Sequence, residues 1–155
     1  MKKKIFITTL FILLFSCIIS IPFLPKKSND LAFASTYQQN LDLLARAVNG
    51  EARGEIYEGQ VAVAAVILNR VKHPSFPNTI AGVIYQPGAF TAVTDGQIHA
   101  YLDRSSTVYK ACQDALNGWD PSGGAIYYYN PAKTTNKWIY SRPVVKVLGN
   151  HTFAK

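Results

Sequence analysis

Apolar positions in the first half of the chain follow helical periodicity. A helix over residues 40–49 is predicted by four apolar residues at i, i+3, i+4 and i+7, the spacing of an amphipathic helix: Leu41, Leu44, Ala45 and Val48. Residues 61–68 are apolar without interruption, which is typical of a helix buried on every side. They predict a core helix over residues 58–72, ended by His73-Pro74 because a residue before proline avoids the helical region.

The second half of the chain predicts short helices and then strands. Thr79 is a plausible N-cap for a short helix with Ile80, Val83 and Ile84 on one face, and residues 89–96 are expected to be extended or irregular. Ser105 or Ser106 caps a further helix that Asn117-Gly118 ends, with this apolar stripe: Val108, Ala111, Cys112, Ala115 and Leu116. Strands are predicted over three segments: residues 125–129, 144–148 and 151–153. Because helices precede strands instead of alternating with them, the pattern indicates an α+β fold with a small antiparallel sheet near the C-terminus.

A run of carboxylates lies at the break between the two apolar segments. Asn49-Gly50 resembles a helix stop, since glycine tolerates the left-handed cap conformation. Glu51 is therefore expected just past the end of the first helix, in a glycine-flanked turn that leads into the core. A carboxylate held in such a turn is partly desolvated, and desolvation favours the protonated form that a general acid requires.

The same segment closely resembles a known family. The motif Gly50-Glu51-Ala52-Arg53-Gly54-Glu55, continued through Asn69-Arg70, is similar to the catalytic domain of SleB/CwlJ-type cell wall hydrolases, the spore cortex-lytic enzymes of endospore-forming bacteria. The likeness covers the chain from about Leu41 to its C-terminus. It continues through further motifs in the same order: Gln86-Pro87-Gly88-Ala89-Phe90, Gly118-Trp119-Asp120-Pro121-Ser122-Gly123-Gly124, Tyr128-Tyr129-Asn130-Pro131-Ala132 and Gly149-Asn150-His151.

This resemblance implies a fold and a mechanism. The fold is a lysozyme-like helical core with the small sheet appended, and the first glutamate of the motif, Glu51, is the catalytic acid. Glycoside cleavage needs an acid to protonate the leaving oxygen. In lytic transglycosylases the C6 hydroxyl of muramic acid attacks its own anomeric carbon, so one glutamate acts as acid and then as base. We hypothesise this mechanism for Glu51.

Other charged residues near Glu51 have weaker assignments. Glu55 is a candidate accessory carboxylate that holds Arg53 or supports the turn. Arg53 is a candidate to orient Glu51 or to bind a substrate carboxylate, with a solvent-facing salt bridge as its alternative. A hydrolysing muramidase or glucosaminidase would use Asp95 or Glu55 as its second carboxylate. Asp95 is the remaining loop acid, although an aspartate that simply makes the turn fits the sequence as well. Glu58 is expected in the first turn of the next helix, where negative charge is favoured.

Aromatic and amide side chains supply candidate sugar-binding groups: Gln86, Tyr127, Tyr128, Tyr129, Asn130 and Trp138. In a strand, Tyr127 and Tyr129 share one face and Tyr128 takes the other. We expect one set to be buried and the other to line the substrate groove.

The N-terminus resembles a targeting segment. Lys2, Lys3 and Lys4 precede an apolar run over residues 5–24, and Ala32-Phe33-Ala34 has the small-x-small pattern of a signal-peptidase site. We expect a signal peptide over residues 1–34 and a catalytic domain over residues 35–155, secreted or extracytoplasmic. An uncleaved anchor, with membrane association through residues 5–24, is the alternative.

Composition narrows the function classes. Five of the 16 basic residues and one of the nine acidic residues lie in residues 1–34, which leaves the remaining domain with a net charge of +3. That excess suits an anionic wall polymer and does not indicate a nucleic-acid partner. Cys112 is the single cysteine of the domain, and no residue spacing indicates a metal site. The expected protein is a monomer without cofactor or metal whose partner is peptidoglycan, and a non-catalytic wall-binding module is the alternative outside enzymes.

Overall fold

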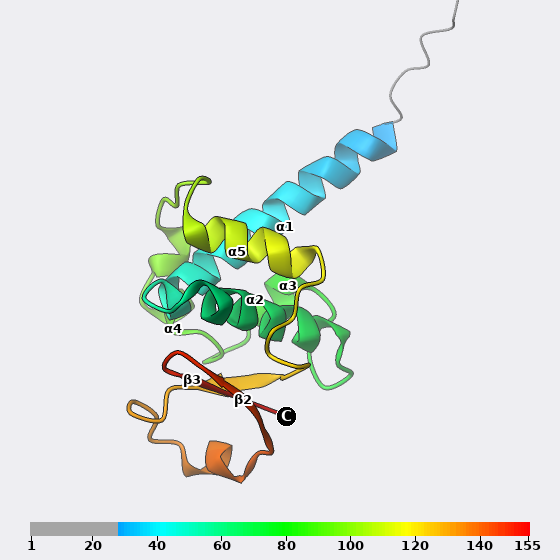
Figure 1. Cartoon of the computed structure of the whole chain (residues 1–155). Coiled ribbons are helices and arrows are strands. Elements are labelled where there is room, and N and C mark those ends of the chain that lie inside the picture. The colour runs from blue at the N-terminus through cyan, green and yellow to red at the C-terminus, as the bar shows by residue number, and fades with distance from the viewer. Residues whose placement is uncertain (1–27) are drawn as a thin grey trace, which may run out of the picture.

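The computed structural model describes residues 28–155, which form a helical layer with a small sheet below it (Figure 1). The helices are α1 (Ser28–Ala52), α2 (Tyr57–Lys72), α3 (Ile80–Ile84), α4 (Thr91–Thr94) and α5 (Thr107–Leu116), with the 3-10 helices η1 (Gln97–His99) and η2 (Lys137–Ser141). The strands are β1 (Tyr127–Tyr129), β2 (Val144–Leu148) and β3 (His151–Ala154). The predicted order of helices before strands is confirmed.

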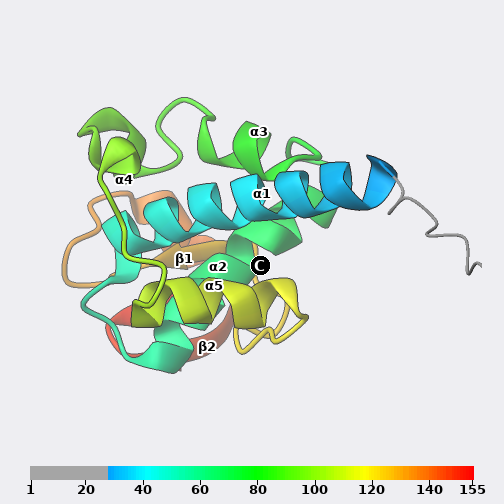
Figure 2. The same cartoon turned by 90° about the horizontal axis from the view of Figure 1, so that it is seen from above.

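Helix α2 is the centre of the core. All residues from Val61 to Ile67 are buried, as the uninterrupted apolar run predicts, and α2 packs against α1, α3 and α5. In the view from above, α1 crosses the domain beside α2 and α5, and its first turns project beyond the domain (Figure 2). Helix α5 begins at the predicted cap, where Ser106 Oγ accepts a hydrogen bond from the Tyr109 amide.

The sheet has strand order β1-β3-β2, and both pairs are antiparallel. Strand β3 is central and fully buried, so it supplies the backbone partners of both neighbours. Tyr128 of β1 pairs with Phe153 of β3. This register brings β1 against the end of α1, where the candidate acid lies.

Three expectations for the backbone are wrong. Helix α1 begins at Ser28 instead of residue 40, and it does not end at Asn49-Gly50 but continues to Ala52. Gly50 is needed for packing instead, because a Cβ placed there would overlap the Cβ of Ala92 on α4. Residues 91–94, expected to be extended or irregular, form the short helix α4, which this close approach places against α1.

The predicted signal peptide falls largely on residues 1–27, outside the described residues. From Ser28 onward, no helix has both the length and the apolar character needed to cross a bilayer.

Candidate active site

Glu51 lies in the last turn of α1 and is held by two other elements. Its Oε1 accepts a hydrogen bond from the Ala92 amide of α4 at 3.2 Å, and its Oε2 accepts one from the Tyr128 hydroxyl of β1 at 3.3 Å. The side chain is half-buried. The sequence analysis placed Glu51 in a turn, whereas the structure fixes it on a helix between α4 and the sheet.

A groove of about 510 Å³ opens beside Glu51. Among the residues that the structure describes, Glu51 and Glu55 are the carboxylates that line it, and Arg70 and Lys133 are the cations. Tyr128, Tyr129 and Asn130 of the predicted sugar-binding set also line this groove. The groove therefore joins side chains that the sequence separates by up to a hundred residues.

Glu55 ties the α1–α2 connection to the β2–β3 turn. Its two carboxylate oxygens accept hydrogen bonds from the Asn150 backbone amide at 2.8 Å and from Asn150 Nδ2 at 3.1 Å. Burial alone would raise the pKa of Glu55, but the hydrogen bonds from Asn150 outweigh burial and the pKa lies below its usual value. Glu55 therefore supports a turn, which was one of its two predicted roles. The turn that it supports is the one between β2 and β3.

Gly149 allows this contact. Its φ is +56°, in the left-handed region that favours glycine, and a Cβ on it would overlap Glu55 Oε2. The Gly149-Asn150-His151 motif therefore has a clear local purpose. It presents the Asn150 amide to Glu55 and leads directly into the buried central strand.

His151 is a buried residue on the wall of the groove. Burial lowers its pKa, although the charges of Glu55 and Glu51 act in the opposite direction. Its Nδ1 is buried without a hydrogen-bond partner within residues 28–155, and it lies 3.9 Å from Glu55 Oε1. The ring packs edge-on against Tyr128, with ring centroids 5.3 Å apart.

Tyr128 is the tyrosine of β1 that faces the helices. Burial and the charge of Glu51 raise its pKa well above the usual value, so the hydroxyl stays protonated and donates to Glu51. Tyr127 packs edge-on against Trp138 and Tyr129 against Tyr140, both of η2, and Tyr129 also lines the groove. The expected split into a buried set and a groove-lining set is wrong, because Tyr128 both packs against the core and lines the groove, and Tyr129 lines the groove as well.

Several predicted site residues lie outside the lining of this groove. Exposed Asp95 accepts hydrogen bonds from the Gln97 amide at 3.0 Å and from Gln97 Nε2 at 2.6 Å, so it makes the turn into η1. Arg53 is also exposed and bonds to the Gln97 side chain, without a hydrogen bond to Glu51 or Glu55 among the described residues. The Gln86 carbonyl closes a turn with the Ala89 amide. Trp138 contacts Tyr127 at the outer face of the sheet.

Arg70 and Lys133 are the charged groove residues that the sequence analysis missed. Arg70 is the more buried of the two. Its Nε donates to the Ile126 carbonyl at 2.7 Å, and its guanidinium lies over the rings of Phe76 and Phe90 at 5.2 and 5.6 Å. Burial lowers the pKa of Arg70. An arginine two residues after an apolar run was a usable signal, because a charge at the end of a buried helix has to reach a polar cleft.

No metal centre is indicated by the side chains. Within the part of the chain that the structure describes, no three His, Cys, Asp or Glu residues form a cluster that could hold an ion.

Comparison with known proteins places this groove in a family. The family model for Cell Wall Hydrolase matches residues 54–154. The chain belongs to this family. The matched segment contains Glu55, Arg70, Tyr128 and His151, and Glu51 lies three residues before it. The family resemblance noted from the sequence is thereby confirmed.

Relatives of this cell wall hydrolase include spore cortex-lytic enzymes. The spore cortex-lytic enzyme of Bacillus cereus is 56% identical over 132 residues, which is 84% of this chain and 50% of that protein. The chain thus spans half the length of that relative.

Two solved structures match the fold. The catalytic domain of Bacillus cereus SleB is 60% identical with a TM-score of 0.71, over 76% of this chain and 91% of that one. The catalytic domain of the germination-specific lytic transglycosylase SleB from Bacillus anthracis is 59% identical with a TM-score of 0.72, over 76% and 95%.

Proposed function

We propose that this cell wall hydrolase is a lytic transglycosylase that cleaves the glycan strands of spore cortex peptidoglycan, with Glu51 as its acid and base. The observation that carries the proposal is the position of Glu51, half-buried in a groove and held by hydrogen bonds from α4 and β1. The similarity to a SleB catalytic domain described as a germination-specific lytic transglycosylase supports the same reaction.

The reaction needs one carboxyl group. Protonated Glu51 donates its proton to the glycosidic oxygen, and the bond from that oxygen to the muramic acid anomeric carbon breaks. The C6 hydroxyl of the same sugar then forms a bond to the anomeric carbon and gives its proton to the Glu51 carboxylate. The products are a free hydroxyl on one strand and a 1,6-anhydro end on the other, with no water consumed and Glu51 protonated again.

The surrounding groups keep Glu51 in place for both proton transfers. The Ala92 amide fixes one oxygen, while the Tyr128 hydroxyl bonds to the other and remains protonated. Glu55 stays ionised beside the groove, where its negative charge favours the positive charge that develops on the sugar.

A hydrolase that uses a second carboxylate is the competing enzyme. Its water-activating group would have to be Asp95 or Glu55. Asp95 is absent from the groove lining, and the hydrogen bonds from Asn150 lower the pKa of Glu55, which makes it a weaker base. These positions favour the single-carboxylate mechanism.

The proposed substrate also determines where the protein acts. Cortex glycan lies outside the cytoplasmic membrane, so the enzyme must be extracytoplasmic. The predicted leader over residues 1–34 would supply export, or a membrane anchor if it is not cleaved. We propose that the protein acts on the polymer as a monomer.

Product analysis tests the proposal. Purified cortex and vegetative peptidoglycan are digested with the full-length protein in ¹⁸O-labelled water, and the fragments are analysed by mass spectrometry. Anhydro ends without ¹⁸O are expected, and they should be more abundant from cortex. Reducing ends that carry ¹⁸O would show hydrolysis. Glu51→Gln should release no fragments, whereas Glu58→Gln, at an exposed glutamate paired with Lys146, should digest normally.

A binding module without turnover would give a different result. It would sediment with cortex but release no fragments, and Glu51→Gln would then be indistinguishable from the native protein.

A further inference from the structure

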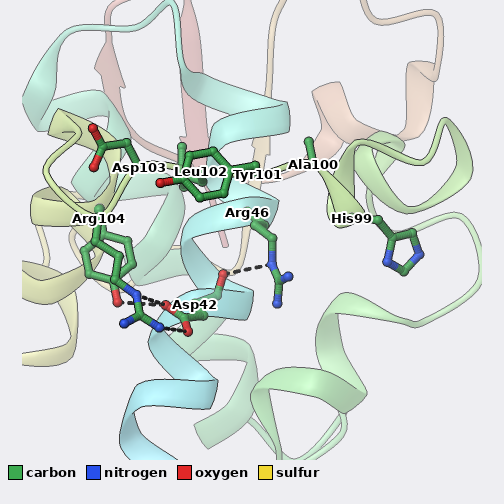
Figure 3. Close-up of a pocket in the computed structure, with 9 residues that line it drawn as sticks. Asp42, Arg46, His99, Ala100, Tyr101, Leu102, Asp103 and Arg104 are labelled. Atoms are coloured by element: carbon green, nitrogen blue, oxygen red, sulfur yellow. Dashed lines mark hydrogen bonds and ion pairs between the residues drawn. The ribbon is translucent and has the colours of Figure 1, made fainter.

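A second cavity is lined by His99, the last residue of η1, and by the loop that follows it. It has a volume of about 590 Å³ and is formed by α1 and the loop that follows η1 (Figure 3). Asp42 and Arg46 come from α1, while His99, Tyr101 and Arg104 come from η1 and the loop. None of these residues lines the groove of Glu51.

One wall of this cavity is held rigidly by Asp42. Its carboxylate accepts hydrogen bonds from Arg104 at 2.7 and 3.2 Å and from the Tyr109 hydroxyl at 2.8 Å. Burial alone would raise the pKa of Asp42, but these bonds outweigh burial and the pKa lies below its usual value. The Asp42–Arg104 pair therefore stays charged and fixes the loop against α1.

Two further side chains of the cavity, those of Arg46 and Tyr101, have groups that a ligand could contact. Arg46 uses only its Nε, which donates to the Asp42 carbonyl at 3.2 Å, and its terminal nitrogens have no hydrogen bond to any of residues 28–155. In Figure 3 the Arg46 guanidinium lies between the Asp42–Arg104 pair and His99. Tyr101 is 92% exposed, so its ring is accessible to a ligand.

The charge balance indicates the class of ligand. The charges of Arg46 and Arg104 are offset by those of Asp42 and Asp103. Such a balance does not select a polyanion. An exposed aromatic ring beside planar hydrogen-bonding groups instead matches a sugar, whose apolar C–H face packs on the ring while its hydroxyl and acetamido oxygens accept hydrogen bonds from guanidinium groups.

We propose that this cavity is a second glycan-binding site, which holds a segment of wall polysaccharide outside the cleavage groove. Tyr101 is the stacking platform, and Arg46 is the free hydrogen-bond donor. The inference rests on the proposed function only in taking its ligand from the same polymer.

The placement of the cavity suits this purpose. Arg46 lies one helical turn before Gly50, which lines the groove, and the segment from Thr91 to His99 contributes its first residue to the groove and its last to the cavity. A strand bound at the second site would therefore hold the enzyme on an insoluble wall while Glu51 acts nearby.

Binding and turnover are tested separately. In a Glu51→Gln background, co-sedimentation with purified cortex is measured for Tyr101→Ala, Arg46→Ala and the double substitution. Each single substitution should weaken binding about twofold to tenfold, as expected when one stacked ring or donor is lost. Tyr85→Ala is the matched control, because Tyr85 is 48% exposed and lines neither cavity.

Turnover is measured in the active protein with the same substitutions. Cleavage of insoluble cortex should slow, whereas cleavage of short soluble glycan fragments should be unchanged, and the melting temperatures should match that of the native protein. Undiminished sedimentation of the folded double variant would overturn the second site, as would an equal loss on soluble fragments. Neither result would affect the proposed function. That proposal fails only if Glu51→Gln retains cleavage or if the newly formed glycan ends carry oxygen from water.

Discussion

The hydroxyl of Tyr128 lies 3.3 Å from Oε2 of Glu51, although 77 positions separate the two residues. This hydrogen bond joins the end of the first helix to the first strand of the terminal sheet. The Ala92 amide holds the other oxygen from a third element. The position of Glu51 therefore depends on contacts between distant parts of the chain. Substitutions at the residues that hold Glu51 can distinguish its positioning from its proton transfer.

Replacing Glu51 with glutamine should remove activity without unfolding the domain. Glutamine keeps the shape and can still accept from the Ala92 amide, but it cannot donate a carboxyl proton to the leaving oxygen. We expect cortex cleavage to fall by about 10²–10⁴-fold, the usual contribution of a general acid. A turbidity assay measures the rate, and thermal unfolding shows whether the fold persists. Substantial residual cleavage would assign the acid to another residue.

Tyr128→Phe should lower kcat with little change in KM. The substitution removes one hydrogen bond to Glu51 and keeps the ring packing against His151 and Phe153. A bond of this kind is worth about 1 kcal/mol, so we expect a loss of roughly fivefold. Kinetics on a soluble glycan fragment give the two constants. Tyr127→Phe is the control outside the groove lining, and an equal loss there would show a general effect on the strand.

Gly50→Ala should destabilise the domain and impair cleavage together. The new methyl group would overlap Ala92 and displace α4, which carries the amide bonded to Glu51. Overpacking of this kind costs about 1–3 kcal/mol of the free energy of unfolding. Urea titration and the cortex assay measure the two effects. Gly54→Ala, where nothing lies within 4 Å of the added methyl, should leave both nearly unchanged.

Glu55→Gln should give a loss of stability that depends on pH. Because folding lowers the pKa of Glu55, its contribution is present above the ordinary pKa of 4.5 and is lost as the pH falls through the lower folded-state value. We expect the variant to be about 1–3 kcal/mol less stable at pH 7, since both bonds to Asn150 involve the charged carboxylate. The difference should shrink below pH 4.5. Urea titrations across this range test the trend, and a constant difference would contradict it.

Asp95→Asn should leave cleavage within about twofold of the native rate. Asp95 is an exposed turn residue bonded to Gln97, and asparagine can keep one of those hydrogen bonds. The cortex assay and the ¹⁸O product analysis measure the result. A large loss of rate would instead favour a hydrolase that uses this aspartate to activate water.

Local patterns predicted much of the fold. The apolar run of α2, the Thr79 and Ser106 caps and the positions of the three strands agree with the structure because each depends on neighbouring residues alone. The end of α1 was mispredicted at Gly50. Glycine after an amphipathic stretch usually ends a helix, but here its missing side chain allows α4 to approach, a contact that no local pattern contains.

The candidate site was predicted less completely for the same reason. The motif around Glu51 and Glu55 is contiguous, and both residues line the groove. Asp95 and Gln86 have the kinds of side chain expected in such a site, but both lie in turns outside the groove. Arg70 and Lys133 enter the groove only because the sheet packs against the end of α2, so their proximity to Glu51 depends on long-range packing.

The central position of β3 makes the candidate site dependent on the last strand of the sheet. Without residues 151–154, β1 has no strand partner, so a partly folded chain would carry Glu51 on its helix but lack the opposite wall and the Tyr128 contact. The candidate site should therefore form only once this segment has docked between β1 and β2.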